Sequence, residues 1–237
     1  MAALLVWYRF LGPLRLWARH RLRVSRVTTD APGVVSVHLI GRGLRRLRAE
    51  PGQFFRWRFL ARGLWWSANP YSLSAAPNAG GLRITVKALG DHSAALARLR
   101  PGTPVIAEGP YGGFTAGLGR TGKSLLIAGG VGITPLRALF ETLPGRVTLL
   151  YRARTPEDLL FRAELEEIVR SRGDAVVYCS AGPRSQDLFD GLTGLLPDLR
   201  EHDAYVCGPR EMTQAAIKAL RSAGVPGRRI HHESFEF

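Results

Sequence analysis

Seven residues with the sequence GGVGITP, Gly129–Pro135, carry the clearest chemical pattern in this chain of 237 residues. They follow an apolar run, Ser124–Ala128, and precede Leu136–Leu143, where apolar residues recur at helical spacing. An order of strand, glycine turn and helix places backbone N–H groups and the positive end of the helix dipole at a pyrophosphate. Pro135 suits the first helical position, where no N–H is needed. The stretch therefore predicts a dinucleotide site.

A second phosphate-binding pattern competes with the first. Residues Gly117–Ser124, GLGRTGKS, match the P-loop pattern of nucleoside triphosphatases in every letter. A P-loop leaves a strand and enters a helix, whereas this match follows a turn-rich stretch and runs into the strand predicted from Leu125. Lys123 would then stand at the entrance of a strand. We therefore interpret residues 117–123 as an interdomain linker and keep a P-loop NTPase only as a remote alternative.

Charge is spread unevenly along the chain, whose formal net charge is +14. Residues 1–116 hold 17 Lys and Arg against 4 Asp and Glu, a net of +13, whereas residues 117–237 hold 16 against 15, a net of +1. The step coincides with the linker and favours two domains. A basic first half indicates an acidic partner or an anionic membrane surface. No helix-turn-helix, zinc or aromatic RNA-binding motif accompanies the charge, so we expect no nucleic-acid partner.

The two cysteines, Cys179 and Cys207, are too few for a disulfide framework, a four-cysteine zinc site or an iron–sulfur cluster. We expect a reduced, cytoplasmic protein that binds no metal itself. Any metal redox centre would then belong to another polypeptide.

The first twenty residues combine apolar, aromatic and basic side chains. Ala2–Tyr8 is apolar but shorter than the ~20 residues that span a bilayer. Six arginines follow within residues 9–26, together with Trp17 and without an acid. Aromatic residues beside arginines favour the cytoplasmic membrane interface, so we interpret residues 1–20 as a membrane-proximal segment, with a solvated basic tail as the alternative. A signal peptide is disfavoured because the charge follows the apolar run.

Short strands separated by Pro-Gly and Gly-rich turns fill residues 21–116, which is typical of a small antiparallel barrel. The predicted strands are Leu22–Thr28, Val34–Ile40, Gln53–Leu60, Tyr71–Ala75, Arg83–Ala88 and Pro104–Glu108, with one helix near His92–Leu99. From residue 124 the pattern changes to alternating strands and helices. This alternation predicts a parallel, doubly wound α/β sheet of five strands. Those strands are Leu125–Ala128, Val147–Tyr151, Ala175–Cys179, Ala204–Cys207 and Ile230–Glu233.

Five motifs in order give the chain a resemblance to the ferredoxin–NADP⁺ reductase superfamily over residues 22–237. They are Pro51–Phe55 (PGQFF), Asn69–Ser74 (NPYSLS), Gly90–Ser93 (GDHS), Gly129–Pro135, and Cys207–Pro209 (CGP) with the terminal Glu233–Phe235 (ESF). The resemblance implies an FAD-binding antiparallel β-barrel domain over residues 21–116. It also implies a domain over residues 124–237 that binds NAD(P)H.

For the barrel, the resemblance implies that Tyr71 packs against the flavin and that the Ser72 hydroxyl lies near flavin N5, with Leu73 following them at the site. Without the neighbouring motifs, Tyr71 reads simply as a strand residue that fills a barrel core. Gly90 and Ser93 lie at the start of the one barrel helix, where N–H groups and a hydroxyl can hold a diphosphate. Because FMN has no diphosphate, FAD is the expected flavin.

One position departs from most ferredoxin reductases, which have a phosphate-binding arginine where this chain has Asn69. The ferric reductases and NADPH oxidases read His-Pro-Phe-Thr/Ser at this place, which Asn69–Ser72 follows more closely. The chain is therefore similar to the dehydrogenase half of that branch. Lys87, Arg83 and His92 are the candidates to replace the missing positive charge.

In the second domain, the resemblance implies that Cys207 lies near nicotinamide C4, whereas on its own it reads as a small buried residue at a strand end. Glu233 and Phe235 fit the terminal motif in which an aromatic ring covers the flavin until nicotinamide displaces it, with Phe237 as the alternative ring. The remaining coenzyme-binding residues implied are Gly130, Gly132, Thr134, Pro135, Gly208 and Pro209.

Coenzyme choice is expected to depend on Ser180, Arg184 and Arg154, which follow the third and second strands of this domain. A serine and basic residues can hold a 2′-phosphate through charge-assisted hydrogen bonds, and no acid stands in residues 180–185 to accept a ribose hydroxyl pair. The sequence therefore predicts NADPH, with NADH as the alternative.

Together these features predict an FAD-dependent enzyme that takes hydride from NADPH and passes single electrons to an external acceptor. Within the branch named above, the expected acceptor is a haem b membrane protein or a ferric chelate, and the expected location is the cytoplasmic face of the membrane. The membrane half would be a separate protein, would have been lost, or would precede Met1 in a longer chain. The alternatives are a soluble ferredoxin- or flavodoxin-type reductase and a non-catalytic nucleotide-binding module.

Overall fold

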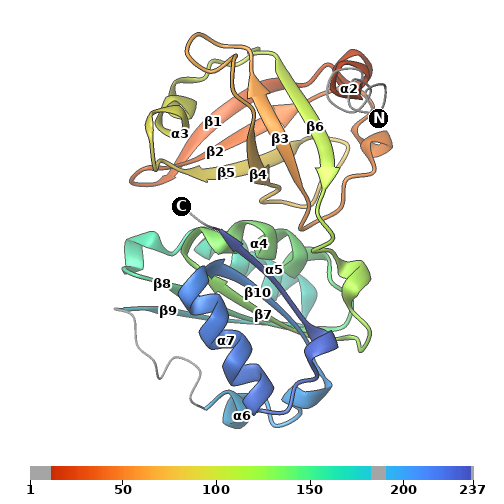
Figure 1. Cartoon of the computed structure of the whole chain (residues 1–237), viewed down its shortest axis with the longest axis vertical. Helices are drawn as coiled ribbons and strands as arrows, with labels where there is room; N and C mark the ends of the chain where they lie inside the picture. Colours follow the sequence, from red (N-terminus) through yellow and green to blue (C-terminus); the bar gives the residue numbers. More distant parts are fainter. Residues whose placement is uncertain (1–11, 183–190, 236–237) are drawn as a thin grey trace, which may run out of the picture. The chain divides into compact units, whose positions relative to one another are not determined.

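A computed structural model of the chain describes residues 12–182 and 191–235, and it divides between Gly112 and Gly113 into two units (Figure 1). The first unit is built mainly from strands. They are β1 (Arg23–Ala31), β2 (Val34–Ile40), β3 (Phe54–Phe59), β4 (Asn69–Ser72), β5 (Leu82–Lys87) and β6 (Val105–Tyr111), with helices α2 (Gly12–His20) and α3 (Asp91–Ala95).

These strands form two antiparallel sheets, ordered β1-β2-β5 and β4-β3-β6. Two isolated bridges join the sheets, one between Leu73 and Ile84 and one between Arg23 and Pro104. The six strands therefore close into a barrel, which confirms the predicted fold of this half. Closure leaves neither sheet with a long free edge.

Alternation along the strands builds the barrel core. In β3 the sequence FFRWRF buries Phe55, Trp57 and Phe59 completely and turns the intervening arginines outward. Full burial of three aromatic side chains in one short strand supplies a large part of the apolar surface that holds the barrel together.

Helix α2 was not expected from the sequence. It packs against β6, and its last residue, His20, is buried. The His20 carbonyl accepts a hydrogen bond from the Arg42 N–H (2.6 Å), and His20 Nδ1 lies 2.8 Å from the Arg42 carbonyl oxygen. Residues 12–20 are thus part of the first unit rather than of a separate segment 1–20. In the part of the chain that the structure describes, no helix has the length and apolar character needed to cross a membrane.

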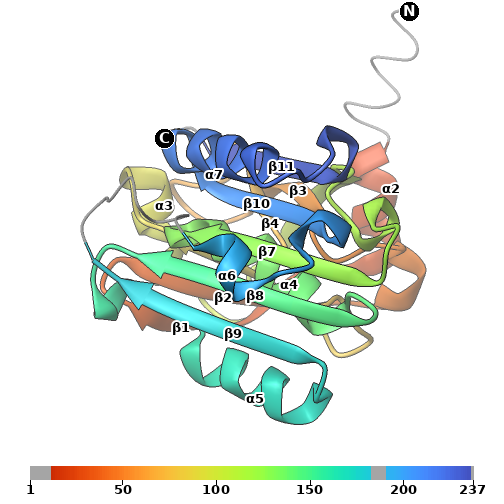
Figure 2. The ribbon, with the colours of Figure 1, turned by 90° about the horizontal axis from the view of Figure 1, so that it is seen from below.

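The second unit contains one parallel sheet of five strands, as predicted, and their order in the sheet is β11-β10-β7-β8-β9 (Figure 2). Its strands are β7 (Lys123–Gly129), β8 (Arg146–Ala153), β9 (Ala175–Ala181), β10 (Asp203–Pro209) and β11 (Ile230–Phe235). Its helices are α4 (Ile133–Thr142), α5 (Arg162–Arg172), α6 (Leu192–Leu195) and α7 (Arg210–Ser222). The direction in which successive strands are added reverses between β7 and β10, and ligands of such sheets bind at this switch point.

One face of the sheet packs against α6 and α7. Leu125 and Ile127 of β7 share a buried cluster with Leu192 of α6 and Ala216 of α7. Helices α4 and α5 connect β7 to β8 and β8 to β9, and they contact each other. Right-handed connections of this kind place both helices on the opposite face of the sheet. The sheet is therefore doubly wound.

The segment predicted as a linker, 117–123, lies inside the second unit, which begins at Gly113. The buried carboxylate of Asp203 holds it, since Oδ2 accepts hydrogen bonds from the N–H groups of Arg120 (2.7 Å) and Thr121 (2.9 Å). Lys123 begins β7 and forms ion pairs with Asp198 (2.8 Å) and Glu201 (2.5 Å). A lysine that enters a strand and is paired in this way does not form a P-loop.

Candidate functional site

Three glycines bring the turn after β7 against the end of β10. A Cβ on Gly132 would lie 2.2 Å from the carbonyl oxygen of Cys207, and one on Gly129 would lie 2.3 Å from Met212 Sδ. A Cβ on Gly208 would lie 3.1 Å from the Gly129 Cα. Gly132 is thus required for close packing of the two strand ends at the switch point, whereas a Cβ on Gly129 would chiefly displace the flexible side chain of Met212.

Gly130 has a different role, because its φ is +53° and a Cβ there would meet nothing within 4 Å. Helix α4 begins at Ile133, so Pro135 is the third helical residue rather than the first. It still lies in the first turn, where N–H groups have no acceptor within the helix. Thr134 is buried, and its Oγ1 donates to the Val131 carbonyl (2.9 Å), so this side chain braces the turn. Backbone N–H groups in such a first helical turn are able to bind a phosphate.

Cys207 and Glu233 are direct neighbours in the sheet, at the carboxyl ends of β10 and β11. Cys207 is fully buried; burial raises the pKa of its thiol well above the usual value, and Glu233 raises it further. Burial raises the pKa of Glu233 to about 7. The pair is therefore a neutral thiol beside a carboxyl group that can gain or lose a proton near neutral pH.

The end of β10 leads directly into a helix, since Pro209 is the residue before α7. Two helix N-termini, those of α4 and α7, therefore start from the carboxyl ends of the two adjacent strands β7 and β10. Phe235 pairs with Pro209 through the backbone, but its side chain lies outside the described residues, as do Arg184 and Phe237.

A pocket of about 280 Å³ opens beside the switch point, within the second unit. Apolar residues of α6 and α7 form one part of its lining, and Arg152, Tyr178 and Ser180 supply polar groups. Arg152 and Ser180 are direct neighbours on β8 and β9. Of the residues predicted from the sequence, Ser180 lines this pocket, whereas Arg154 lies beyond the end of β8, is exposed and does not line it.

In the first unit, Tyr71 and Ser72 end β4, and Leu73 follows directly after it. Tyr71 is half-buried against the barrel core, and burial raises the pKa of its phenol to about 12, so the ring is neutral. Its carbonyl accepts a hydrogen bond from Trp57 Nε1 (2.9 Å), which fixes the backbone. Ser72 is buried, and Leu73 is fully buried where it bridges to Ile84. Leu73 thus has a packing role.

The candidates to replace the missing arginine lie on elements next to β4. Asn69 Nδ2 is 2.9 Å from His92 Nδ1, and burial lowers the pKa of His92, so this ring is a neutral acceptor. Arg83 donates to Ser74, from Nε to Oγ (3.1 Å) and from Nη2 to the carbonyl (2.7 Å). Lys87 ends β5 and is exposed.

Gly90 and Ser93 form a capped start to α3. Ser93 Oγ accepts hydrogen bonds from the N–H groups of Leu89 (2.9 Å) and Gly90 (3.1 Å), and it donates to the Gly90 carbonyl (2.9 Å). The hydroxyl therefore shapes this turn. A Cβ on Gly90 would meet nothing within 4 Å, so the turn is open to a ligand. Within the described residues, no group of three or more His, Cys, Asp or Glu side chains could hold a metal ion.

Comparison with known proteins relates both units to flavin-linked reductases. Residues 126–218 match the family described as the oxidoreductase NAD-binding domain. Over 190 residues the chain is 30% identical to ferredoxin–NADP reductase B of Sorangium cellulosum, covering 70% of this chain and 77% of that protein. It is 31% identical over 185 residues to the glycine betaine monooxygenase reductase subunit of Chromohalobacter salexigens, covering 70% of this chain.

Among solved structures, the FAD/NAD-binding domain of nitric oxide dioxygenase from Vibrio cholerae has a TM-score of 0.75 and 25% identity. The match covers 91% of this chain and 98% of that domain. The chain spans only 50% of the glycine betaine monooxygenase reductase subunit and 57% of the ferredoxin reductase component of the 3-ketosteroid-9-alpha-monooxygenase of Mycolicibacterium smegmatis.

Proposed function

Because the chain belongs to the ferredoxin–NADP reductase family, we propose that it is an NAD(P)H-dependent flavin oxidoreductase that passes single electrons to a separate acceptor. The barrel would bind FAD, and the second unit would bind the pyridine nucleotide. When bound, FAD supplies the conversion of a two-electron hydride transfer into two one-electron transfers.

The observation that carries the proposal is the arrangement at the switch point of the second unit. The glycine turn after β7, the neutral thiol of Cys207 and the titratable carboxyl of Glu233 meet at the carboxyl edge of adjacent strands. A P-loop or a purely structural sheet end has no need of a proton-holding group beside a nucleotide turn.

The residues of this chain act mainly by positioning. Gly130 and the first turn of α4 supply backbone N–H groups for the pyrophosphate, and Gly132 and Gly208 keep the strand ends close. Cys207 fills the strand end with a small neutral group against which a nicotinamide ring can lie. Glu233 holds or releases a proton near neutral pH. In the barrel, Tyr71 offers a neutral ring, and Ser72 a hydroxyl, to the flavin.

Arg152 and Ser180 are the proposed 2′-phosphate ligands, together with the sequence-predicted Arg184. A guanidinium and a hydroxyl on adjacent strands suit a phosphate, so NADPH is the proposed coenzyme. Arg152→Glu is expected to shift the preference towards NADH by at least about tenfold, or about 1.4 kcal/mol. Arg154→Glu is the matched control. If only the control variant changes the preference, the phosphate is held outside this pocket.

Asn69 is the feature that separates this chain from most of the family, and the proposed replacement for the absent arginine is Lys87. Lys87 is the exposed last residue of β5, the strand whose Ile84 bridges to Leu73, and it is close in sequence to the open turn at Gly90. Lys87→Gln should weaken FAD binding more in low salt than in high salt, as measured by equilibrium dialysis, because the contact is electrostatic. An unchanged affinity would exclude Lys87.

Two acceptor classes follow from different observations. The sequence motif at Asn69–Ser72 supports a haem b membrane partner or a ferric chelate, with the protein attached to the cytoplasmic membrane face through the arginines of residues 9–26. The relatives named as reductase subunits of monooxygenases support a protein acceptor such as an oxygenase component.

The experiment that separates these classes mixes the reduced protein anaerobically with ferric citrate, with a [2Fe–2S] ferredoxin and with membranes that contain haem b. The acceptor that reoxidises it fastest identifies the class.

A further inference from the structure

The loop between β3 and β4 exposes two adjacent tryptophans. Trp65 and Trp66 are 60% and 59% exposed, whereas Trp57, a few residues earlier, is completely buried. Tryptophan buries more apolar surface than almost any other side chain when it packs, so exposure of two in succession is unusual for a folded surface.

The loop is ordered, so the exposure is built into the fold. Leu64 is only 2% exposed and packs into the barrel core, and its N–H donates to the Ala61 carbonyl (3.0 Å). Arg58 Nη1 donates to the carbonyl oxygens of Trp65 (3.0 Å) and Trp66 (3.1 Å). The two rings meet edge to face, with centroids 6.1 Å apart. Packing of Leu64 and the hydrogen bonds from Arg58 therefore hold the loop against the barrel, while both tryptophan rings stay exposed to solvent.

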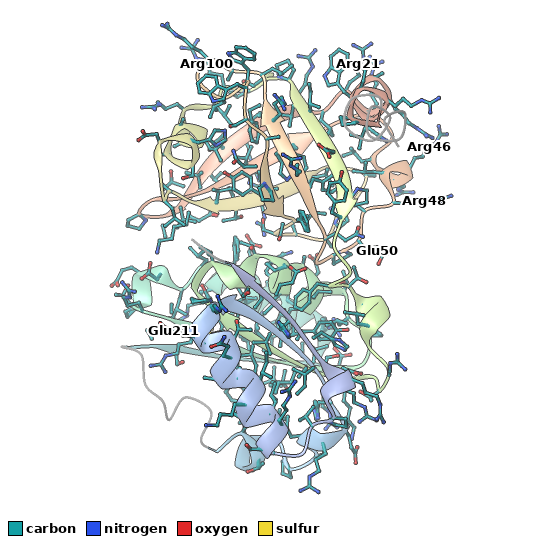
Figure 3. All side chains as sticks on the ribbon, in the orientation of Figure 1. Arg21, Arg46, Arg48, Glu50, Arg100 and Glu211 are labelled. Atoms are coloured by element: carbon teal, nitrogen blue, oxygen red, sulfur yellow. The ribbon has the colours of Figure 1, made fainter. Side chains whose placement is uncertain are left out.

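Hydrogen bonds bring the basic segments around Arg23 and Arg100 to the end of the barrel where the tryptophan loop begins. The Leu60 N–H donates to the Pro104 carbonyl (2.9 Å), and the Val105 N–H donates to the Leu22 carbonyl (2.9 Å). Arg23 Nη1 donates to the Gly102 carbonyl (3.0 Å). Figure 3 shows Arg21 and Arg100, which flank these contacts, at one end of the first unit. We call this region the tryptophan–arginine end; it comprises Trp17, Arg21, Arg23, Leu60, Arg62, Trp65, Trp66 and Arg100.

All charged side chains in the segments that form the tryptophan–arginine end are basic. Residues 12–29, 51–90 and 92–107, which contain all its members, include no Asp or Glu. The guanidinium of Arg21 lies 4.8 Å from the centre of the Trp17 ring, and the backbone at Arg21 has a φ of +47°. Glycine usually takes that conformation after a helix, so an arginine here is held at a conformational cost.

We propose that the tryptophan–arginine end binds an anionic lipid surface, with Trp65 and Trp66 inserted at the level of the headgroups. Tryptophan favours the interface between lipid and water, and guanidinium groups bind lipid phosphates. Two further observations favour a bilayer over a protein. Leu14 of α2, the helix that leads into this end, is 56% exposed, and the sequence before α2 contains the apolar run Ala2–Tyr8. The inference does not depend on the proposed redox function, and it assigns membrane binding to the folded barrel rather than to the arginine-rich N-terminus alone.

The test is flotation of the full chain with phosphatidylcholine vesicles, with and without phosphatidylglycerol, in low and high salt. We expect binding to the anionic vesicles that salt weakens. Trp65→Ser/Trp66→Ser should lower the partition coefficient at least about tenfold, or about 1.4 kcal/mol, and Arg62→Gln/Arg100→Gln should reduce the dependence on anionic lipid. Val176→Ser, which removes an exposed apolar group from the second unit, is the matched control and should bind as the unaltered chain does.

Quenching by lipids with brominated acyl chains gives a second readout. Tryptophan emission should fall when the chain binds anionic brominated vesicles, and most of that loss should vanish in Trp65→Ser/Trp66→Ser. Binding of the double variant equal to that of the unaltered chain would overturn the proposal. So would negligible binding to every vesicle, or saturable binding of this end to an acceptor protein alone.

Discussion

Replacing each of two glycines of the same turn by alanine should lower protein stability and coenzyme binding to different extents. In Gly132→Ala the new Cβ would lie 2.2 Å from the Cys207 carbonyl oxygen and 2.8 Å from the Gly208 Cα. An ordinary contact between carbon and oxygen is about 3.3 Å or more, so the end of β10 must move by about 1 Å. The φ of Gly132 is −60°, which alanine adopts readily, so the whole cost is steric.

Overpacking of this kind costs about 1–3 kcal/mol, and rigid backbone on both sides favours the upper half of that range. Gly130→Ala meets no atom within 4 Å, and only its φ of +53° opposes the change, which costs about 1 kcal/mol. We therefore expect Gly132→Ala to lower the free energy of unfolding by about 2 kcal/mol or more, and Gly130→Ala by about half as much.

The assay is urea denaturation of both variants without ligand and with saturating NADP⁺. At a hundredfold excess over Kd the unaltered protein should gain about 2.7 kcal/mol. Gly130→Ala should keep most of its intrinsic stability but lose much of that gain, because its methyl group would obstruct the proposed contact of the backbone with the pyrophosphate. Gly132→Ala should lose both intrinsic stability and stabilisation by NADP⁺. Unfolding of Gly132→Ala at the same urea concentration as the unaltered protein would refute the packing argument.

Three further outcomes test individual side chains. Burial raises the pKa of Glu233 from 4.5 to about 7, so the unfolded chain ionises first and the free energy of unfolding should fall as pH rises through that window. Glu233→Gln should therefore be more stable than the unaltered protein at about pH 8 and should match it at about pH 4, with a difference that solvent screening of this partly exposed carboxyl group reduces. Urea denaturation across pH measures this, and parallel curves would contradict it. Ser72→Ala should retain FAD and slow flavin reduction in stopped-flow mixing, and an unchanged rate would remove the hydroxyl from the reaction. Lys123→Ala should break its ion pairs with Asp198 and Glu201 but leave coenzyme affinity and NADPH-dependent reduction unaltered, and a loss of coenzyme binding would revive its assignment to a phosphate site.

The positions of the strands along the chain were predictable because each unit has its own periodicity. Alternation buries Phe55, Trp57 and Phe59 in β3, and the glycine turn after β7 marks the strand end by its composition. Closure of the barrel was expected from the number of strands, but the bridges that achieve it, such as Leu73 with Ile84, are tertiary contacts without a local pattern.

The features that the sequence did not reveal depend on distant partners. Helix α2 has no acidic residue in its first turn, and it is held by packing on β6 and by the contacts between His20 and Arg42. The supposed linker is bound by Asp203, about eighty positions away in the chain. Arg152 was missed because its importance comes from the register of β8 against β9, which sets it beside Ser180. In each case the local sequence carries no pattern that predicts the feature, because the contacts that form it come from residues far apart in the chain.

Anaerobic stopped-flow reduction of the purified, FAD-reconstituted chain tests the central claim most directly. We predict a yellow protein whose flavin absorbance at about 450 nm is lost on mixing with NADPH, faster than with NADH, and is restored by a one-electron acceptor. A chain that stays colourless after incubation with FAD, or a bound flavin that neither nucleotide reduces, would contradict it.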